Sequence, residues 1–325
     1  MEKTSSAADQ ISGPLFNQGH SLMARIFVVN ADDLGVSRGA TLGIVQAHLD
    51  GVVTSASLSP TGADYIHAVE TVNRRCPELG IGLHFTLSAG KPISASANVP
   101  LLIDQDGYFR WEFVSLLKTL KFRQNGELLD QIEIELEAQL LKLLEDGVTP
   151  DHIDSERHVH LIPGIFERVV RAANRHRIPF VRAGNDMSLT CIRLQHFSPL
   201  FLHGGILKFM LLQSLRRRSL ALLDHSGRGQ VRFCDNFASY LYTGRLDLVL
   251  QQVLAKAPAG ITEIMVHPGI PEESRNVALG NPGLEHYLVQ MDRKLELEAC
   301  IEARKFPQHL QIKNFRSLAK EPDGS

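Results

Sequence analysis

A short apolar stretch that ends in two acids is the sequence feature that most constrains the fold. Residues 26–29 are apolar without polar alternation, which is typical of a strand buried on both faces of a parallel sheet. Asp32 and Asp33 follow at its end, before Gly35. Parallel sheets keep their chemistry at the carboxyl ends of strands, so one acid can bind a cation while the other accepts a proton. A single Asp would more often cap a helix, but two in succession favour a functional site.

Strands and helices alternate after this stretch. The pattern predicts helices over residues 40–49 and 64–75 and strands over 52–58 and 79–87. This β-α-β-α-β order predicts an α/β fold with parallel strands, a (β/α) barrel of the TIM type that is distorted or incomplete. His84 lies in the last of these strands among apolar residues, where a histidine is more often a hydrogen-bonded core residue. Further helices are predicted over 127–144, 164–176 and 281–304, the last of them on the outside.

A second dense group of polar residues occupies the run from 151 to 163. Three histidines and three acids in ten residues exceed what a surface loop needs, and imidazole and carboxylate are ligands of divalent ions. His267 closes an apolar strand over 262–267 and contributes to the same face of the sheet. Arg182 closes a strand over 178–182. The further candidates for the site or its substrate side are Asp154, His158, His160 and Arg182.

The alternation indicates one main domain. We expect the barrel over residues 25–310, with a mobile tail over 1–24 and a second tail over 311–325. Residues 88–113 are rich in turn signals and predict a long excursion over the barrel mouth. Residues 186–235 break the α/β rhythm and predict an inserted or covering segment.

Composition excludes several classes of protein. The chain has 325 residues, 44% of them hydrophobic, and a net charge of −2, so no bulk basic field predicts a nucleic-acid partner. Its four cysteines lack CxxC spacing, which argues against a zinc knuckle or a disulfide scaffold and favours a reducing cytoplasm. Residues 1–21 contain no apolar run long enough for a signal peptide or a membrane span.

One apolar helix allows a membrane contact. Residues 201–218 are apolar round most of the predicted helix and end in Arg216, Arg217 and Arg218. Such a helix either packs on the barrel or lies in a membrane interface, where the arginines would hold anionic headgroups. The run is too short and too interrupted to span a bilayer. The second alternative predicts a protein peripheral to the inner membrane.

With these residues assembled, the chain resembles the YdjC/ChbG family of carbohydrate deacetylases and, more distantly, the NodB-type polysaccharide deacetylases. The matching pieces keep the family order from about residue 25 to 305 and leave out the termini and the segment 190–235. They are Asn30-Ala31-Asp32-Asp33-Leu34-Gly35, Gly51-Val52-Val53-Thr54-Ser55, Gly82-Leu83-His84, His152-Ile153-Asp154-Ser155, His158-Val159-His160 and His267-Pro268.

The resemblance implies a role for each matching residue. Asp33 and His84 should be metal ligands, Asp32 the general base and His267 a candidate general acid. One position departs from the family, whose motif usually reads His-x-Asp-Ser-His-x-His-x-His and whose middle histidine is the third metal ligand. Glu156 stands at that position here.

A carboxylate at position 156 changes the expected metal site. Because carboxylates bind Mg²⁺, Zn²⁺ and Mn²⁺, Glu156 is the expected third ligand, and His158 is the alternative. The same substitution is also compatible with an inactive protein.

The expected function is therefore metal-dependent removal of an N-acetyl group from an amino sugar, an oligosaccharide or an amino-sugar-bearing lipid. One divalent ion, Mg²⁺ or Zn²⁺, would activate water, Asp32 would take its proton and His267 would protonate the leaving amine. One alternative is a non-catalytic protein that binds carbohydrate or lipid headgroups on the same fold. Another is a different metal-dependent hydrolase such as a phosphoesterase, although no phosphate-cradling glycine loop is present. A homodimer is compatible with the sequence.

Overall fold

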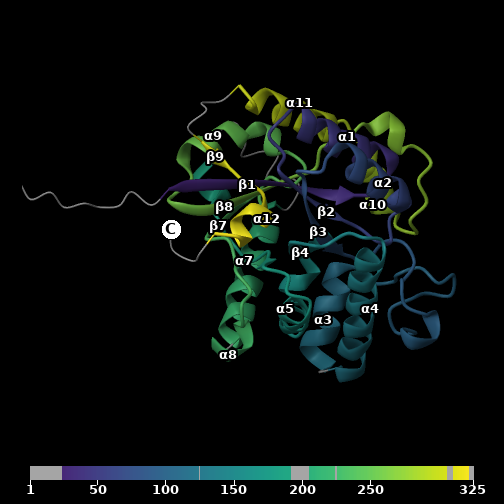
Figure 1. Cartoon of the computed structure of the whole chain (residues 1–325). Helices are drawn as coiled ribbons and strands as arrows, with labels where there is room; N and C mark the ends of the chain where they lie inside the picture. Colours follow the sequence, from purple (N-terminus) through teal and green to yellow (C-terminus); the bar gives the residue numbers. More distant parts are fainter. Residues whose placement is uncertain (1–23, 124, 192–204, 224, 306–309, 322–325) are drawn as a thin grey trace, which may run out of the picture.

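The computed structural model describes residues 24–123, 125–191, 205–223, 225–305 and 310–321 (Figure 1). Its centre is a sheet of nine strands in the order β5-β4-β3-β2-β1-β8-β7-β6, with β9 beside β1, and every pairing is parallel. The sheet curls into an incomplete barrel, as the sequence predicts. The strands are β1 (Arg25–Leu34), β2 (Ser55–Leu58), β3 (Gly80–Phe85), β4 (His152–Ser155), β5 (Phe180–Val181), β6 (Asn185–Asp186), β7 (Asn236–Ala238), β8 (Gly260–Val266) and β9 (Gln311–Ile312).

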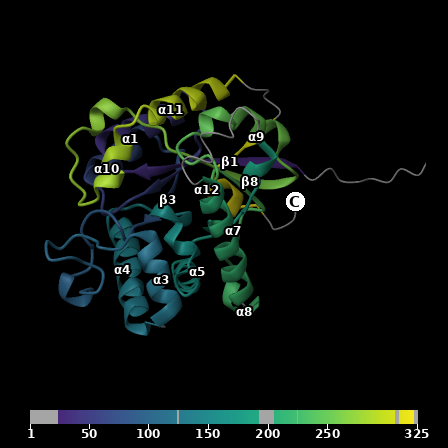
Figure 2. The ribbon, with the colours of Figure 1, turned by 180° about the vertical axis from the view of Figure 1, so that it is seen from behind.

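Helices surround the curled sheet. Figures 1 and 2 show α3, α4 and α5 together on one flank, with α1, α9 and α11 on the opposite flank. The larger helices are α1 (Arg38–Leu49), α2 (Tyr65–Arg75), α3 (Phe113–Arg123), α4 (Gly126–Glu145), α5 (Ile165–Arg175), α7 (Gly205–Leu222) and α11 (Asp292–Ala303). The shorter ones are α8 (His225–Arg228), α9 (Leu250–Lys256), α10 (Pro282–Leu288) and α12 (Phe315–Ala319), with a 3-10 segment η2 (Glu156–Leu161) after β4.

The interior of the barrel is apolar at one end and polar at the other. At the amino ends of the strands, Val28, Phe180 and Phe315 form a buried apolar cluster. Further along β1 the same inward face carries Asn30 and Asp32, since side chains alternate along a strand. The apolar cluster therefore closes one end of the barrel and leaves the polar chemistry at the other.

The carboxyl-terminal part of the chain differs most from our expectations. Residues 311–325 were expected to form a tail, but β9 pairs with β1 and α12 supplies Phe315 to the buried cluster. The helix expected over 281–304 consists of α10 and α11, and α11 reaches the barrel interior rather than only covering it. The tail expected over 1–24 lies outside the described residues except for Ala24.

The segment 186–235 also has more structure than its sequence suggested. It contains α7 and α8, while residues 192–204 lie outside the described part. Helix α7 packs on the barrel through Phe209, Leu212 and Leu215. All four cysteines, which lie among the described residues, are buried thiols outside any disulfide.

Candidate active site

The two acids of the first strand point in different directions because the backbone turns between them. Asp33 has φ +74°, in the left-handed region, and the pairing of β1 with β2 shifts between Ala31 and Leu34. This conformation is uncommon for a residue with a side chain, although Asp tolerates it better than most. Asp32 and Asp33 are both buried, and each meets a different arginine.

Asp32 is held by Arg182 through two parallel hydrogen bonds. Nη1 donates to Oδ2 at 2.7 Å, and Nη2 donates to Oδ1 at 2.7 Å. The Asn30 amide donates to Oδ1 at 3.0 Å. A carboxylate offers about four lone-pair positions, so three are filled and one stays available to take a proton. The clamp fixes the orientation that a general base needs.

Arg182 binds three carboxylates at once. Besides Asp32, its Nη2 lies 2.6 Å from Asp154 Oδ2 and its Nε donates to Glu263 Oε1 at 2.7 Å. Burial alone would lower the pKa of Arg182, but these three carboxylates outweigh it and hold the pKa well above its usual range. The guanidinium is therefore a permanent cation that keeps the acids of the barrel interior in place.

His84 lies between two acids. Its Nδ1 is 2.7 Å from Asp154 Oδ1, and its Nε2 is 3.5 Å from Asp33 Oδ1. Burial would lower the pKa of His84, but Asp154, Asp33 and Asp32 outweigh it and raise the pKa well above its usual range. A carboxylate on one ring nitrogen is the usual arrangement behind a metal-bound histidine, because it fixes the tautomer and frees the other nitrogen.

Asp33 is the second of these acids, and its other oxygen binds a cation. Arg293 Nη1 donates to Oδ2 at 2.7 Å, which leaves Oδ1 directed at His84. Burial would raise the pKa of Asp33, but Arg293 and His84 hold it well below its usual range. The carboxylate is therefore ionised, as a metal ligand must be.

Glu156 stands at the start of η2, where the backbone is strained. Arg157 and His158 both have positive φ, at +51° and +60°. Two such residues in succession cluster mainly at functional sites. Glu156 Oε2 accepts a hydrogen bond from the Ser88 hydroxyl, while Oε1 is buried without a hydrogen-bond partner. Burial raises the pKa of Glu156.

The donor atoms fit a divalent ion at Asp33 and His84. Bonds of about 2.0–2.2 Å at a tetrahedral centre separate two ligand atoms by roughly 3.4 Å, close to the 3.5 Å between Asp33 Oδ1 and His84 Nε2. Glu156 Oε1, which has no hydrogen-bond partner and lies 3.3 Å from Arg157 Nε, is a further buried acceptor. A cavity of about 10 Å³, the size of one water, touches both His84 and Glu156.

A second set of donors lies close together but already holds a cation. Within the described ranges, Asp32, His84 and Asp154 are the one trio of acids, histidines or cysteines whose ligand atoms all lie within 4.8 Å of one another. Arg182 directly binds two of these three groups, the carboxylates of Asp32 and Asp154. Asp33, His84 and Glu156 are not so tightly grouped, so the assignment of Glu156 as a ligand stays a prediction.

His267 lies at the end of β8 and faces α10 and α11. Its backbone N–H donates to Glu296, its Nδ1 lies 3.7 Å from Glu296 Oε2, and its ring meets Tyr287 edge to face at 5.8 Å. Nδ1 has no hydrogen-bond partner.

Two histidines of the second cluster, His158 and His160, have different surroundings. His160 lies 2.5 Å from the Ser155 hydroxyl and 3.0 Å from the Arg182 carbonyl, and burial lowers its pKa to about 3, so it is a neutral residue that supports the Arg182 backbone. His158 packs edge to face on Tyr240 at 4.8 Å, with its Nδ1 buried and unpartnered. His158 therefore borders the site, whereas His160 belongs to the scaffold.

Sequence reasoning missed several residues of the site. Glu263 follows the alternation of β8, where it shares the inward face with His267, so a glutamate inside an apolar strand was a usable signal. Asn30 shares the face of Asp32 in the same way. Arg293 and Glu296 carried no such signal, because charged residues on a helix usually face solvent.

Comparisons with known proteins show what this chain is similar to. A family model described as "YdjC-like protein" matches residues 26–309. A carbohydrate deacetylase from Geobacillus stearothermophilus is 38% identical over 210 residues, which cover 64% of this chain and 77% of the relative. A chitooligosaccharide deacetylase from Salmonella typhi is 32% identical over 267 residues, which cover 76% of this chain and 98% of the relative.

The fold has a counterpart among solved structures. A protein from Enterococcus faecalis, described as a candidate cellobiose-phosphate cleavage protein, superimposes with a TM-score of 0.64 at 24% identity and covers 91% of this chain and 99% of its own. At this identity the likeness concerns the fold alone. The match of the family model over residues 26–309 shows that the chain belongs to the YdjC-like protein family.

Proposed function

We propose that this protein is a metal-dependent hydrolase that removes the N-acetyl group from an amino sugar, either free, in an oligosaccharide or on a lipid. The relatives named carbohydrate deacetylase and chitooligosaccharide deacetylase support the reaction class. The observation that carries the proposal is the division between the two adjacent acids. Asp32 is clamped by Arg182 with one lone pair free, whereas Asp33 shares a cation-sized space with His84.

Each residue has a task in this proposal. A divalent ion held by Asp33, His84 and Glu156 would polarise the acetyl carbonyl and make water acidic enough to react near neutral pH. Asp32 takes the proton of the attacking water through its free lone pair, and Arg182 keeps the carboxylate oriented. Asp154 holds His84 in the tautomer that exposes Nε2. His267 donates a proton to the departing amine.

The proposal is tested by acetate release. Purified protein, stripped with chelator and reloaded separately with Mg²⁺, Mn²⁺ or Zn²⁺, is incubated with N-acetylglucosamine, its oligomers and an N-acetylated glycolipid. We expect acetate from at least one substrate and only with a metal present. Acetate release that is equal in Asp32→Asn and the parent protein would contradict the assigned chemistry.

The alternative of a non-catalytic binding protein is tested at Glu156, the proposed third metal ligand. A binding protein without catalysis would keep the fold but have no use for the third ligand. We predict that Glu156→Gln weakens metal binding about 10-fold or more in calorimetry, a loss of the size seen when the partners of metal ligands are removed. Asp104→Asn, on an exposed loop, serves as the control. An unchanged metal affinity in Glu156→Gln would remove Glu156 from the ligand set.

A membrane contact through α7 is a finer part of the proposal. No helix in the part of the chain that the structure describes is long and apolar enough to cross a bilayer. Leu207 and Met210 of α7 are 74% and 62% exposed, and they could enter a lipid interface. Arg216 is already engaged, because its Nε donates to the Ala183 carbonyl at 2.6 Å. Arg217 and Arg218 are exposed and suit anionic headgroups.

Vesicle co-sedimentation tests this contact. With vesicles of phosphatidylcholine and phosphatidylglycerol, we expect the double variant Arg217→Gln, Arg218→Gln to bind less than the parent protein. The control variant replaces Arg74 and Arg75, an exposed pair on α2, in the same way. Absence of binding by the parent protein would end the membrane proposal and leave the deacetylase proposal untouched.

A further inference from the structure

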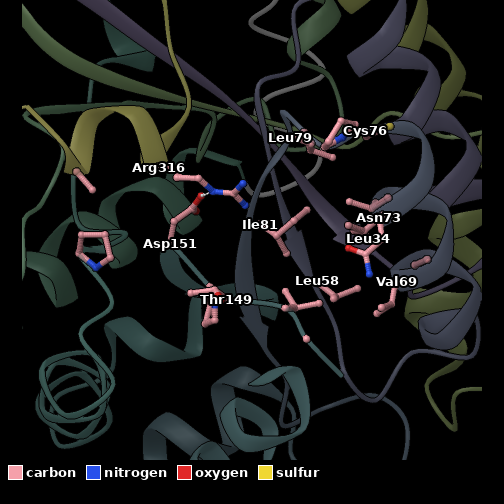
Figure 3. Close-up of a pocket in the computed structure, with 18 of the residues that line it drawn as sticks. Leu34, Leu58, Val69, Asn73, Cys76, Leu79, Ile81, Thr149, Asp151 and Arg316 are labelled. Carbon is pink, nitrogen blue, oxygen red and sulfur yellow. Dashed lines mark ion pairs between the residues drawn. The ribbon is translucent and has the colours of Figure 1, made fainter. Parts of the chain in front are cut away.

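A hollow of about 740 Å³ lies between α2 and the connection from α4 to β4. Figure 3 shows Leu58, Val69 and Asn73 on one side of it and Thr149 and Asp151 on the other. Its volume is within the range of small-molecule sites, roughly 300–1,000 Å³. Nothing in the proposed function uses this space.

The hollow is separate from the candidate active site. Ile81 lines it, whereas His84 on the same strand β3 faces the barrel interior, and Leu58 lines it next to the inward Ser57 on β2. Side chains of a strand alternate between its two faces. A molecule in the hollow would therefore touch the outer face of the sheet and none of the site residues.

Helices α2 and α4 are tied together through Tyr65. Tyr65 Oη donates to Asp146 Oδ2 at 2.6 Å, and Lys142 Nζ donates to the same oxygen at 2.6 Å. Away from this tie, the facing residues Asn73 and Thr149 are small and polar. Beneath them, Val72 is buried at 7% exposure, whereas Val69 is half-buried and lines the hollow.

The rim of the hollow is positive. Arg177, Arg316 and Lys320 line it, against a single acid, Asp151. Arg316 Nε lies 3.9 Å from Asp151 Oδ2, and its guanidinium points across the hollow toward Ile81 (Figure 3). Within the described residues, Arg177 and Lys320 have no carboxylate within salt-bridge distance. The rim therefore has a surplus of positive charge.

We propose that this hollow is a second binding site, which takes a molecule with an apolar body and one anionic end, such as a fatty acid. The apolar body lies against the half-buried Val69, above a floor formed by the buried Leu58 and Ile81. The anionic end meets Arg316 and Lys320 at the rim, where three cations face the single acid Asp151. This site is independent of the proposed deacetylation.

Calorimetry with the full chain tests the site directly. The probe is decanoate, with decan-1-ol, decyltrimethylammonium and acetate as comparison ligands at equal concentration. We expect one decanoate to bind per chain, the alcohol to bind more weakly, and neither the cation nor acetate to bind. Equal binding of the cation, or no binding of decanoate, would overturn the proposal.

Two kinds of variant separate the apolar body from the charge. Val69→Trp fills the hollow from α2 and should abolish decanoate binding, and Thr149→Trp fills it from the other wall in case the first variant folds poorly. The double variant Arg316→Gln, Lys320→Gln should weaken decanoate binding severalfold, since exposed ion pairs each make a modest contribution. Lys305→Gln, an exposed lysine after α11, should leave it unchanged.

The same variants distinguish other occupants. Decanoate binding that survives both tryptophan variants, or that ignores the loss of the rim charges, would contradict the proposal. A dimer of the parent protein in size-exclusion chromatography that Val69→Trp separates would show that the hollow is an interface between two copies, and this too would overturn it.

Discussion

At the scale of single residues, the adjacent acids Asp32 and Asp33 have different surroundings because each has its own arginine, and the proposed division of roles rests on this difference. Arg182 clamps both oxygens of Asp32, whereas Arg293 binds one oxygen of Asp33 and leaves the other facing His84. The turn at Asp33, with its positive φ, makes this separation possible. The two carboxylates should therefore respond differently to the same substitution.

We predict that Asp32→Asn keeps the metal and loses about 100-fold or more of the turnover, the usual contribution of a general base. Asp33→Asn and His84→Ala should lose the metal itself, because each removes a proposed ligand atom. Metal content per chain by mass spectrometry, together with acetate release, checks both statements. Equal metal loss in all three variants would disprove the division of roles.

A second residue-scale prediction concerns Asp186, whose buried carboxylate accepts the backbone N–H groups of Ser188 and Tyr240 at 2.6 and 2.7 Å. Burial raises its pKa from 3.8 to about 6. The folded state thus binds this proton more tightly than the unfolded state, so the group's contribution to stability is present below about pH 4 and is lost as the pH rises to about 6. The shift corresponds to about 3 kcal/mol.

Asp186→Asn cannot ionise, so we expect the free energy of unfolding of this variant to fall less between pH 4 and 6 than that of the parent protein. Urea denaturation at a series of pH values measures the difference. Asp106→Asn, in an exposed loop, is the control and should follow the parent curve. Parallel curves for Asp186→Asn and the parent protein would argue against a raised pKa.

At the scale of elements, helix α11 orients two functional residues from outside the barrel. Arg293 holds Asp33, and Glu296, three residues later on the same face, binds the backbone N–H of His267. The Arg293 side chain is fully buried, with its guanidinium 5.0 Å from the Tyr287 ring. Arg293 is therefore a positioning residue, and its loss should affect metal binding as well as folding.

We predict that Arg293→Met lowers the free energy of unfolding by about 3–5 kcal/mol, because it removes the permanent cation from the buried Asp33 Oδ2. A divalent ion would then replace the missing cation, so Mn²⁺ should raise the melting temperature of this variant more than that of the parent protein. Lys294→Met, exposed on the same helix, is the control. An equal shift with Mn²⁺ in both proteins would contradict the role of Arg293.

At the scale of the whole molecule, the barrel is closed at one end by the last described helix. Phe315 of α12 packs on His152 at 4.3 Å and on Phe180 at 5.1 Å, at the end of the barrel opposite the site. We predict that Phe315→Ala lowers the free energy of unfolding by about 3–5 kcal/mol in urea denaturation. Lys320→Ala should have little effect, and comparable losses in the two variants would refute the closing role of Phe315.

The sequence predicted the parallel barrel and its central residues because strands carry their own signal. The acids after residues 26–29 and His84 at the end of β3 lie at strand ends, where topology alone brings them together. Residues from outside this frame could not be found in the same way. The inward reach of Arg293 and the closing role of Phe315 depend on how distant helices pack, which no local periodicity records.

Arg182 bears on whether the chain folds before or after it binds a divalent ion. Three buried carboxylates in a bare interior would repel one another during collapse, and an ion from solution would be needed to complete the fold. The guanidinium arrives with the chain itself and meets all three as β5 joins β4. We therefore expect the polypeptide to fold without a divalent ion, so that metal supply would limit the proposed activity and not the yield of folded chain.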